Sequence, residues 1–179
     1  MAYTRLTFDE AFDRLIGHEG GFSRDPKDPG NWTGGSVGNG LPKGTKYGIA
    51  ANTYPDLDIE NLTLEHAKEI YYRDWWLKVG GDVLDPAILY QLWTFAINSG
   101  MGNAKRALQR AAGAAEDGKI GPITIAKIQA MSLDDLLLQF FAAKIRYYTS
   151  LRQGFIDFGR GWMNRVADDL DYAAKDNKS

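Results

Sequence analysis

The sequence predicts a mainly helical protein with a small irregular or β-hairpin lobe near its N-terminus. Three observations support this fold class. Hydrophobic residues recur at helical spacing over most of the chain, capping signals precede several of these segments, and residues 30–48 are rich in glycine and poor in helix formers. With 179 residues, 44% of them hydrophobic, the chain can bury a core as one domain or as two small lobes that share a core.

The first predicted helix follows a T-x-x-E capping box formed by Thr7 and Glu10, and it ends at Gly20–Gly21. Its apolar stripe consists of Phe8, Phe12, Leu15 and Ile16. Residues 30–48 follow as a loop or a small hairpin sheet.

Later helices are predicted from N-caps, from proline at the first helical position and from glycine stops. The expected segments are one from Thr63 to residue 78, one from Asp85 to Gly100, residues 104–112, a short helix from Gly121–Pro122, a long helix from Ser132 to near Gly154, and residues 159–175.

Composition excludes several classes of function. A net charge of −2, from 21 basic and 23 acidic residues, gives no electrostatic surface for nucleic acid. The absence of cysteine excludes disulfides, thiolate zinc sites and a cysteine nucleophile, and two histidines argue against a zinc hydrolase. We therefore expect no metal and no cofactor. The sequence contains no run that could serve as a secretory signal or insert stably in a membrane, so we expect a protein that is made soluble.

Glu19 falls within the apolar stripe of the first helix when its helical spacing is continued. A carboxylate among apolar neighbours has a raised pKa, because burial disfavours the charged form. A raised pKa suits a general acid that works near neutral pH. The alternative is that Glu19 lies past the helix end and caps the backbone or pairs with a basic side chain.

Two aspartates, Asp25 and Asp28, follow in a loop that its prolines prevent from being helical. The simple interpretation is an Asx-turn at each position. The functional one is that Glu19 and an aspartate of this loop form the pair of carboxylates used in glycoside hydrolysis.

The segments "HEGGFSRDPKDPG" and "TKYGIA" resemble the catalytic segment of glycoside hydrolase family 108, the muramidases of the lysozyme superfamily. "WTFAINSG" is a further match, and "DGKIGPITI" and "FGRGWMNRV" resemble the peptidoglycan-binding part of such enzymes. The resemblance implies a lysozyme-like α+β fold. It also implies a catalytic lobe at residues 1–100 and a helical peptidoglycan-binding lobe at residues 101–179 that shares its core.

By this resemblance Glu19 is the catalytic acid, and Asp28 and Thr45 are the residues that position or activate water. The loop between the D-P-G motif and Thr45 is longer than is usual in the family. This insertion, residues 31–44, is expected to extend the wall of the substrate cleft or to change substrate choice.

Substrate-binding candidates are aromatic residues that could stack on sugar rings and one amide at a helix end. They are Trp32, Tyr47, Trp75 and Asn98, with Trp76 and Trp93 as further aromatic candidates. The alternative for each aromatic residue is a place in the core, and the alternative for Asn98 is capping of the helix C-terminus.

The implied reaction is hydrolysis of the β-1,4 bond between N-acetylmuramic acid and N-acetylglucosamine in the glycan strands of peptidoglycan. The resemblance and the missing signal suggest a monomeric phage endolysin that accumulates in the host cytoplasm. A holin-like partner would then release it to the periplasm and cell wall.

Three alternatives stay open from the sequence. A lytic transglycosylase would use one glutamate without adding water, and a chitinase would cleave a related glycan. A non-catalytic wall-binding module would have no use for a carboxylate in an apolar stripe, which costs stability. Sequence gives no separation between carboxylates, so inversion and retention of configuration both stay open.

Overall fold

The computed structural model describes residues 6–16, 21–81 and 83–177. The chain forms two compact units, which we call the N-terminal unit (Phe8–Asp74) and the helical unit (Met1–Thr7 with Trp75–Ser179). Helices dominate, and the N-terminal unit carries a two-stranded sheet. The predicted fold class, mainly helical with a small hairpin lobe, is confirmed. The functional division at residue 100 stays a prediction.

Two helices of the N-terminal unit, α1 (Phe8–Ile16) and α2 (Leu64–Tyr71), pack through aromatic rings. The ring of Phe12, 1% exposed, lies 5.9 Å from that of Tyr71. A salt bridge of 2.9 Å between Lys68 and Asp9 adds a polar contact between the same helices. The predicted N-cap of α2 is present, since the Thr63 hydroxyl accepts a hydrogen bond from the His66 amide. Phe12, in the apolar stripe read from the sequence, therefore faces the core of its own unit, while Phe8, Leu15 and Ile16 are half-buried.

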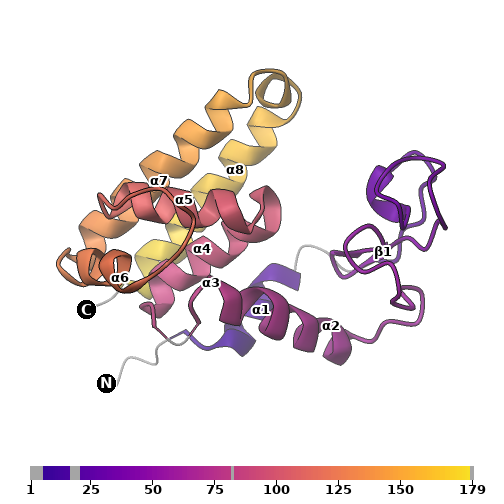
Figure 1. Cartoon of the computed structure of the whole chain (residues 1–179), viewed down its shortest axis with the longest axis horizontal. Coiled ribbons are helices and arrows are strands. Elements are labelled where there is room, and N and C mark those ends of the chain that lie inside the picture. The colour runs from indigo at the N-terminus through magenta and orange to yellow at the C-terminus, as the bar shows by residue number, and fades with distance from the viewer. Residues whose placement is uncertain (1–5, 17–20, 82, 178–179) are drawn as a thin grey trace. The chain divides into compact units, whose positions relative to one another are not determined.

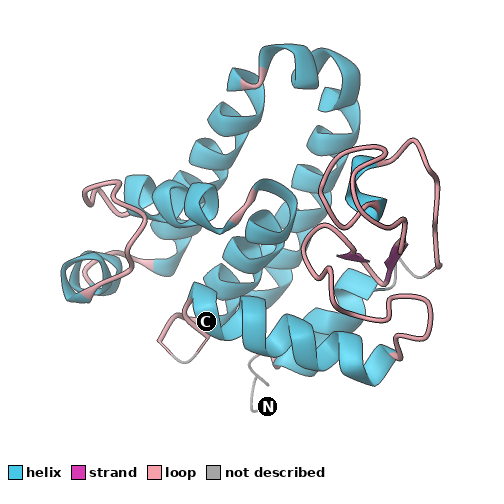
Figure 2. Ribbon diagram, turned by 45° about the vertical axis from the view of Figure 1, so that its right-hand side comes forward, coloured by secondary structure: helices cyan, strands magenta, loops and turns pink. Residues whose placement is uncertain are grey.

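The sheet is a single hairpin of β1 (Thr45–Lys46) and β2 (Ile49–Ala50), shown in magenta in Figure 2. Its strands are antiparallel, with Thr45 opposite Ala50. The two residues of the turn both have positive φ, 51° at Tyr47 and 73° at Gly48, as a type I′ turn requires. Glycine adopts this conformation freely, whereas tyrosine does so at a cost in energy.

The insertion at residues 31–44 is held by its own hydrogen bonds. Trp32 and Pro42 form an isolated β-bridge, and the Thr33 amide donates to the Leu41 carbonyl. The Leu41 amide in turn donates to the Thr33 hydroxyl at 2.9 Å. A side chain at Gly40, where φ is 81°, would collide with that hydroxyl. Glycine at position 40 thus allows this loop to fold tightly.

The helical unit contains most of the remaining elements. They are α3 (Leu77–Val79), α4 (Pro86–Ser99), α5 (Met101–Ala111), α6 (Pro122–Gln129), α7 (Leu133–Ser150) and α8 (Arg152–Asp176). A π-helical segment, η2 (Tyr72–Trp76), spans the boundary between the units. None of the helices in the described ranges is both long and apolar enough to cross a membrane.

Helix α4 is the centre of the helical unit. It starts as predicted, with the Asp85 carboxylate accepting a hydrogen bond from the Ala87 amide and Pro86 in the first turn. Residues 87–96 are all buried, because α5, α7 and α8 pack around this helix. A helix that is surrounded on its sides in this way is apolar all round. Its ring at Phe95 meets those of Phe140 and Tyr148 edge-on.

Helices α7 and α8 run antiparallel beside each other and join at one end (Figure 1). The break between them lies at Leu151, whereas the sequence predicted it between Gly154 and Gly159. That prediction was wrong because glycine was taken as a helix stop. Helix α8 continues through its glycines, since tertiary packing outweighs a propensity cost of about 1 kcal/mol for each.

Two of these glycines are explained by packing inside α8. A Cβ atom at Gly154 would lie 3.0 Å from the ring of Trp162, and one at Gly159 would lie 3.0 Å from the ring of Phe155. Gly161 differs, because a Cβ atom there would meet nothing within 4 Å. Packing therefore gives no reason for glycine at position 161.

A buried ion pair joins α7 to α8. The ammonium group of Lys144, 0% exposed, lies 2.5 Å from the Asp169 carboxylate. The Gln91 side chain of α4 donates to the Asp169 carbonyl at 3.0 Å. Burial lowers the pKa of Lys144, and the neighbouring carboxylate opposes that shift.

Candidate active site

Glu19, the predicted acid, lies outside the described residues. The aspartate loop that follows it is described, and both of its aspartates form Asx-turns. Asp25 accepts a hydrogen bond from the Lys27 amide at 2.9 Å, and Asp28 accepts one from the Gly30 amide at 2.8 Å. Asp28 is also the N-cap of the short 3-10 helix η1 (Pro29–Asn31). The Asx-turn interpretation is thus confirmed, and a catalytic role for Asp28 stays a prediction.

Thr45 is linked to the same turn through Asn31. The Thr45 hydroxyl donates to Oδ1 of Asn31 at 2.7 Å. The amide nitrogen of Asn31 donates to the Asp25 carbonyl at 3.0 Å. Because a carbonyl can only accept, this bond fixes which end of the amide faces Thr45. The Thr45 proton is therefore committed to Asn31, and the lone pairs of its oxygen are available to accept a hydrogen bond.

Asn31 is a site residue that sequence reasoning missed. It is the last residue of η1 and is completely buried. Buried amides are costly unless they are hydrogen-bonded, so a polar residue here implies defined partners. The available signal was an asparagine directly after the D-P-G motif, but spacing alone did not distinguish it from a loop asparagine.

Trp32 and Tyr47, two predicted sugar-stacking residues, are both half-buried in the N-terminal unit. The indole of Trp32 donates to the Pro26 carbonyl at 3.0 Å, which holds the ring against the aspartate loop. The Tyr47 carbonyl accepts a hydrogen bond of 3.1 Å from the Tyr71 hydroxyl. That contact anchors the hairpin turn at its strained residue. Both rings are thus positioned by backbone contacts close to Asp28 or Thr45 in the chain.

Trp75 and Asn98 belong to the helical unit, as do the further candidates Trp76 and Trp93. Trp75 is half-buried in η2. Trp76 and Trp93 are buried and meet edge-on at 5.4 Å, so these two are core residues. The side chain of Asn98 donates to the Thr94 carbonyl at 2.8 Å, one turn earlier in α4. This is the predicted capping alternative, and Asn98 also borders a cavity.

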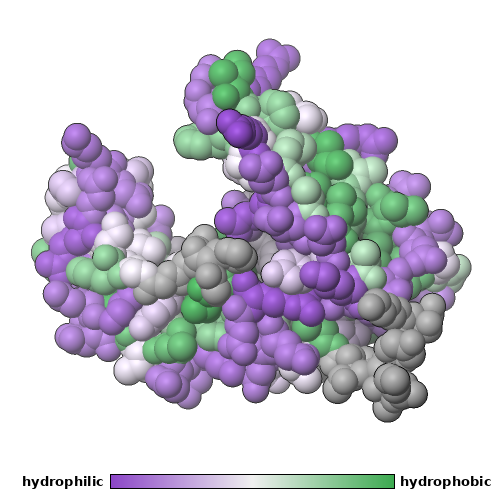
Figure 3. All heavy atoms as spheres, turned by 180° about the vertical axis from the view of Figure 1, so that it is seen from behind, coloured by the Kyte–Doolittle hydropathy of each residue, from purple (hydrophilic) through white to green (hydrophobic). Residues whose placement is uncertain are grey.

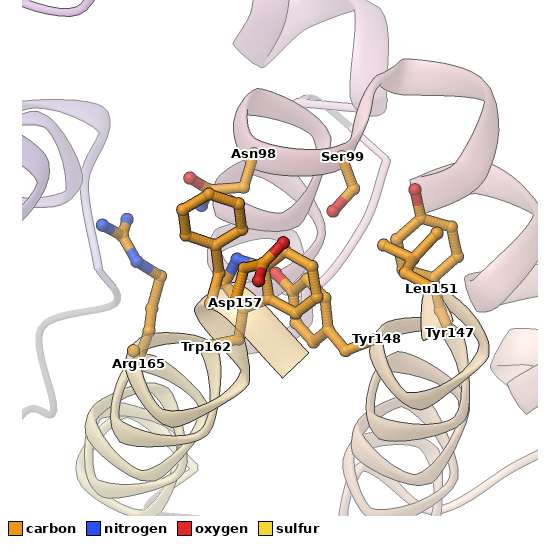
Figure 4. Close-up of a pocket in the computed structure, with 10 residues that line it drawn as sticks. Asn98, Ser99, Tyr147, Tyr148, Leu151, Asp157, Trp162 and Arg165 are labelled. Carbon is orange, nitrogen blue, oxygen red and sulfur yellow. The ribbon is translucent and has the colours of Figure 1, made fainter. Parts of the chain in front are cut away.

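The cavity lies between the end of α4, the end of α7 and the start of α8, and has a volume of about 480 Å³. Figure 4 shows Arg165 and Asn98 on one side of it and Tyr147 and Leu151 on the other. Burial raises the pKa of the Tyr148 phenol in its wall, and a hydrogen bond with Ser99 opposes that shift. This phenol therefore stays protonated at neutral pH.

The described part of the N-terminal unit holds a hydrogen-bond acceptor and a carboxylate in defined orientations. Thr45 offers an acceptor whose own proton is already bonded, and Asp28 offers a carboxylate fixed by its turn. Asn31 ties the two to one rigid backbone segment. An acceptor and a carboxylate held in this way suit activation of water for hydrolysis.

Comparison with known proteins gives a consistent assignment. A family model described as Glycosyl hydrolase 108 matches residues 12–100. Among solved structures, one titled "Structure of Brucella abortus SagA" is similar to this chain, with a TM-score of 0.80 and 29% sequence identity. The alignment covers 96% of this chain and 97% of that one. No curated protein matches the chain.

Proposed function

The chain belongs to glycosyl hydrolase family 108 and is a glycoside hydrolase, and we propose on that premise that it is a muramidase. The bond it would cleave is the β-1,4 bond between N-acetylmuramic acid and N-acetylglucosamine in peptidoglycan. The family match spans Glu19, Asp28 and Thr45 together.

The observation that carries the proposal is the hydrogen-bonded link from Thr45 through Asn31 to the aspartate turn. A binding module has no need of an oriented acceptor that is linked to the turn of a fixed carboxylate. A hydrolase needs both, because water must be held while its proton is removed. The link therefore supports a reaction that adds water.

In the proposed reaction the carboxylic acid of Glu19 donates its proton to the glycosidic oxygen, and the bond from that oxygen to the anomeric carbon breaks. A water molecule donates one hydrogen bond to the Thr45 hydroxyl oxygen and gives its other proton to the Asp28 carboxylate. Its oxygen forms the new bond to the anomeric carbon. Glu19 thus begins protonated and Asp28 begins ionised, as their different roles require.

We also propose a biological setting for this reaction. The enzyme acts as a monomeric phage endolysin and is released by a holin-like partner. Residues 101–179 bind peptidoglycan.

The test is the chemistry of the fragments released from purified peptidoglycan. Borohydride reduction followed by mass spectrometry identifies the new sugar end. Reducible N-acetylmuramic acid ends are expected, and Glu19→Gln should abolish their release while the protein stays folded. Anhydromuramic ends would instead identify a lytic transglycosylase and remove the water-directing role of Asp28 and Thr45. Release by Glu19→Gln at the wild-type rate would exclude Glu19 as the acid.

A further inference from the structure

The junction of α7 and α8 forms one end of the helical unit, and the proposed hydrolysis uses no residue of this end. We call residues 146–165 the α7–α8 tip. We propose that this tip binds the surface of a membrane that contains anionic lipids. Such binding goes beyond the proposed reaction and does not depend on it.

Large apolar side chains at the α7–α8 tip are open to solvent. Ile156 is 78% exposed, Phe158 is 62% exposed and Leu151 is 37% exposed. Figure 3 shows hydrophobic atoms, in green, together with hydrophilic atoms at the upper end of the helical unit, where Figure 1 places this junction. Single exposed apolar residues are common on protein surfaces, but a group of them in one short segment indicates a surface that contacts a partner.

Arginines lie around these apolar side chains. Arg152 precedes Ile156 by four residues and Arg160 follows it by four, so the three share one face of α8. Arg146 is exposed near the end of α7. In the part of the chain that the structure describes, these three arginines form no ion pair, whereas Arg110 pairs with a carboxylate at 2.8 Å. Their charges are therefore available to an anionic partner.

Charge is segregated along the pair of helices. The α7–α8 tip contains four arginines and one aspartate, a net charge of +3, in a chain whose net charge is −2. The remainder of α7 and α8, residues 133–145 and 166–176, contains six aspartates and two lysines, a net charge of −4. Because the helices run antiparallel and α7 alone is about 27 Å long, these charges lie toward opposite ends of the pair. An anionic surface therefore attracts the tip and repels the other end, which orients the tip toward that surface.

A lipid surface accounts for both the charge and the exposed apolar groups. Anionic headgroups attract the arginines, and the boundary between headgroups and acyl chains receives the apolar side chains. The long stems of the arginines keep their guanidinium groups at the level of the headgroups. A soluble anionic polymer would pair with the arginines but would leave Ile156 and Phe158 in water. An uncharged apolar groove of another protein would cover these two side chains but would leave the arginines without a role.

The experiment is a flotation assay of the full chain with large unilamellar vesicles. One set contains equal parts of phosphatidylcholine and phosphatidylglycerol, and the other contains phosphatidylcholine alone. We expect saturable binding to the anionic vesicles and binding to the neutral ones that is weaker by about tenfold or more. Salt at about 1 M, which screens charges beyond about 3 Å, should weaken binding to the anionic vesicles.

The contribution of charge is tested by the double variant Arg152→Gln/Arg160→Gln. It should bind anionic vesicles about 25-fold more weakly than wild type, since each arginine near such a surface contributes about fivefold in affinity. The control is Arg106→Gln/Lys175→Gln, which removes the same number of positive charges from positions outside the α7–α8 tip. That variant should bind like the wild type.

The contribution of apolar contact is tested by Ile156→Ala, which should weaken binding by about tenfold. The matched control is Ile123→Ala, because Ile123 is 77% exposed in α6 and Ile156 is 78% exposed in α8. The control should bind like the wild type. Alanine favours the helix at both positions, so both thermal midpoints should stay close to that of the wild type. A loss of binding then reports on the surface and not on the fold.

Four results would contradict lipid binding by the tip. The first is equal binding to neutral and anionic vesicles, and the second is unchanged binding by the double arginine variant. The third is unchanged binding by Ile156→Ala, which would mean that charge alone acts, as it would toward any anionic polymer. The fourth is assembly of the chain without vesicles that the double arginine variant abolishes, which would make the acidic end of a second copy the partner.

Failure of the proposed function gives a different pattern from failure of membrane binding. In that case the wild-type chain releases no fragments from peptidoglycan but still binds anionic vesicles. Glu19→Gln should likewise bind the vesicles as the wild type does, because Glu19 is not part of the α7–α8 tip.

Discussion

The Thr45 hydroxyl donates a hydrogen bond of 2.7 Å to Oδ1 of Asn31, a side chain that is 0% exposed. This bond couples the first strand of the hairpin to the 3-10 turn that Asp28 caps. It gives Thr45 two roles in one side chain. The proton completes a buried polar contact, and the oxygen can accept from a water molecule in the proposed reaction.

Two substitutions of Thr45 should distinguish the effect of its hydroxyl group from the effect of its size. Thr45→Val keeps the shape of the side chain and leaves the buried Oδ1 of Asn31 without its donor, which costs about 1–3 kcal/mol of unfolding free energy. Loss of the oriented acceptor should also lower the rate of peptidoglycan cleavage by about tenfold or more. Thr45→Ser keeps the hydroxyl and should stay within a few-fold of wild type. Urea denaturation and a turbidity assay measure the two effects, and equal activity of the valine and serine variants would contradict the role.

Substitutions of Asp28 can test the role of its negative charge separately from its role in the turn. Asparagine is as good an N-cap as aspartate, so Asp28→Asn should keep the hydrogen bond to Gly30 and the stability of the turn. Asp28→Ala removes the cap and should cost about 1 kcal/mol. If the carboxylate activates water, both variants lose most of their activity although only the alanine variant loses stability.

The matched control for this experiment is Asp25→Asn, because Asp25 forms the same kind of turn with the Lys27 amide. That variant should cleave peptidoglycan at close to the wild-type rate. An active Asp28→Asn would limit Asp28 to its structural role as a cap.

The sequence was sufficient for features that depend on neighbouring residues. The caps at Thr63, Asp85 and Ser132 start their helices where predicted, because capping is decided within one turn. The α7–α8 break was placed too late, because glycine was taken as a helix stop, whereas α8 continues through Gly154 and Gly159 with the rings of Trp162 and Phe155 beside them. What holds this stretch helical is the packing of α8 against α7 and α4, which local signals do not reveal.

The candidate site likewise combines features that the sequence predicts with features that it does not reveal. Asx-turns at Asp25 and Asp28 follow from loop sequence, and the structure contains both. The contact of Thr45 with Asn31 joins residues 14 positions apart and depends on the hairpin register, which two-residue strands do not reveal in the sequence. The cavity beside Gly161 needs three helices to exist, so no single segment indicates it.

The buried pair of Lys144 and Asp169 should be important for stability without taking part in catalysis. Lys144→Met leaves the Asp169 carboxylate buried without its partner, which should destabilise the protein by about 3–5 kcal/mol. The double variant Lys144→Met/Asp169→Leu removes both charges together and should recover most of that loss. Gln91 can still donate to the Asp169 carbonyl in the double variant, since that bond uses the backbone.

The control is Arg110→Met, which breaks the more exposed pair with Glu116 and should cost less than about 1 kcal/mol of unfolding free energy. Urea denaturation of the wild type and the three variants measures these differences. A double variant as unstable as Lys144→Met would mean that lost packing, and not the unpaired charge, accounts for the lost stability.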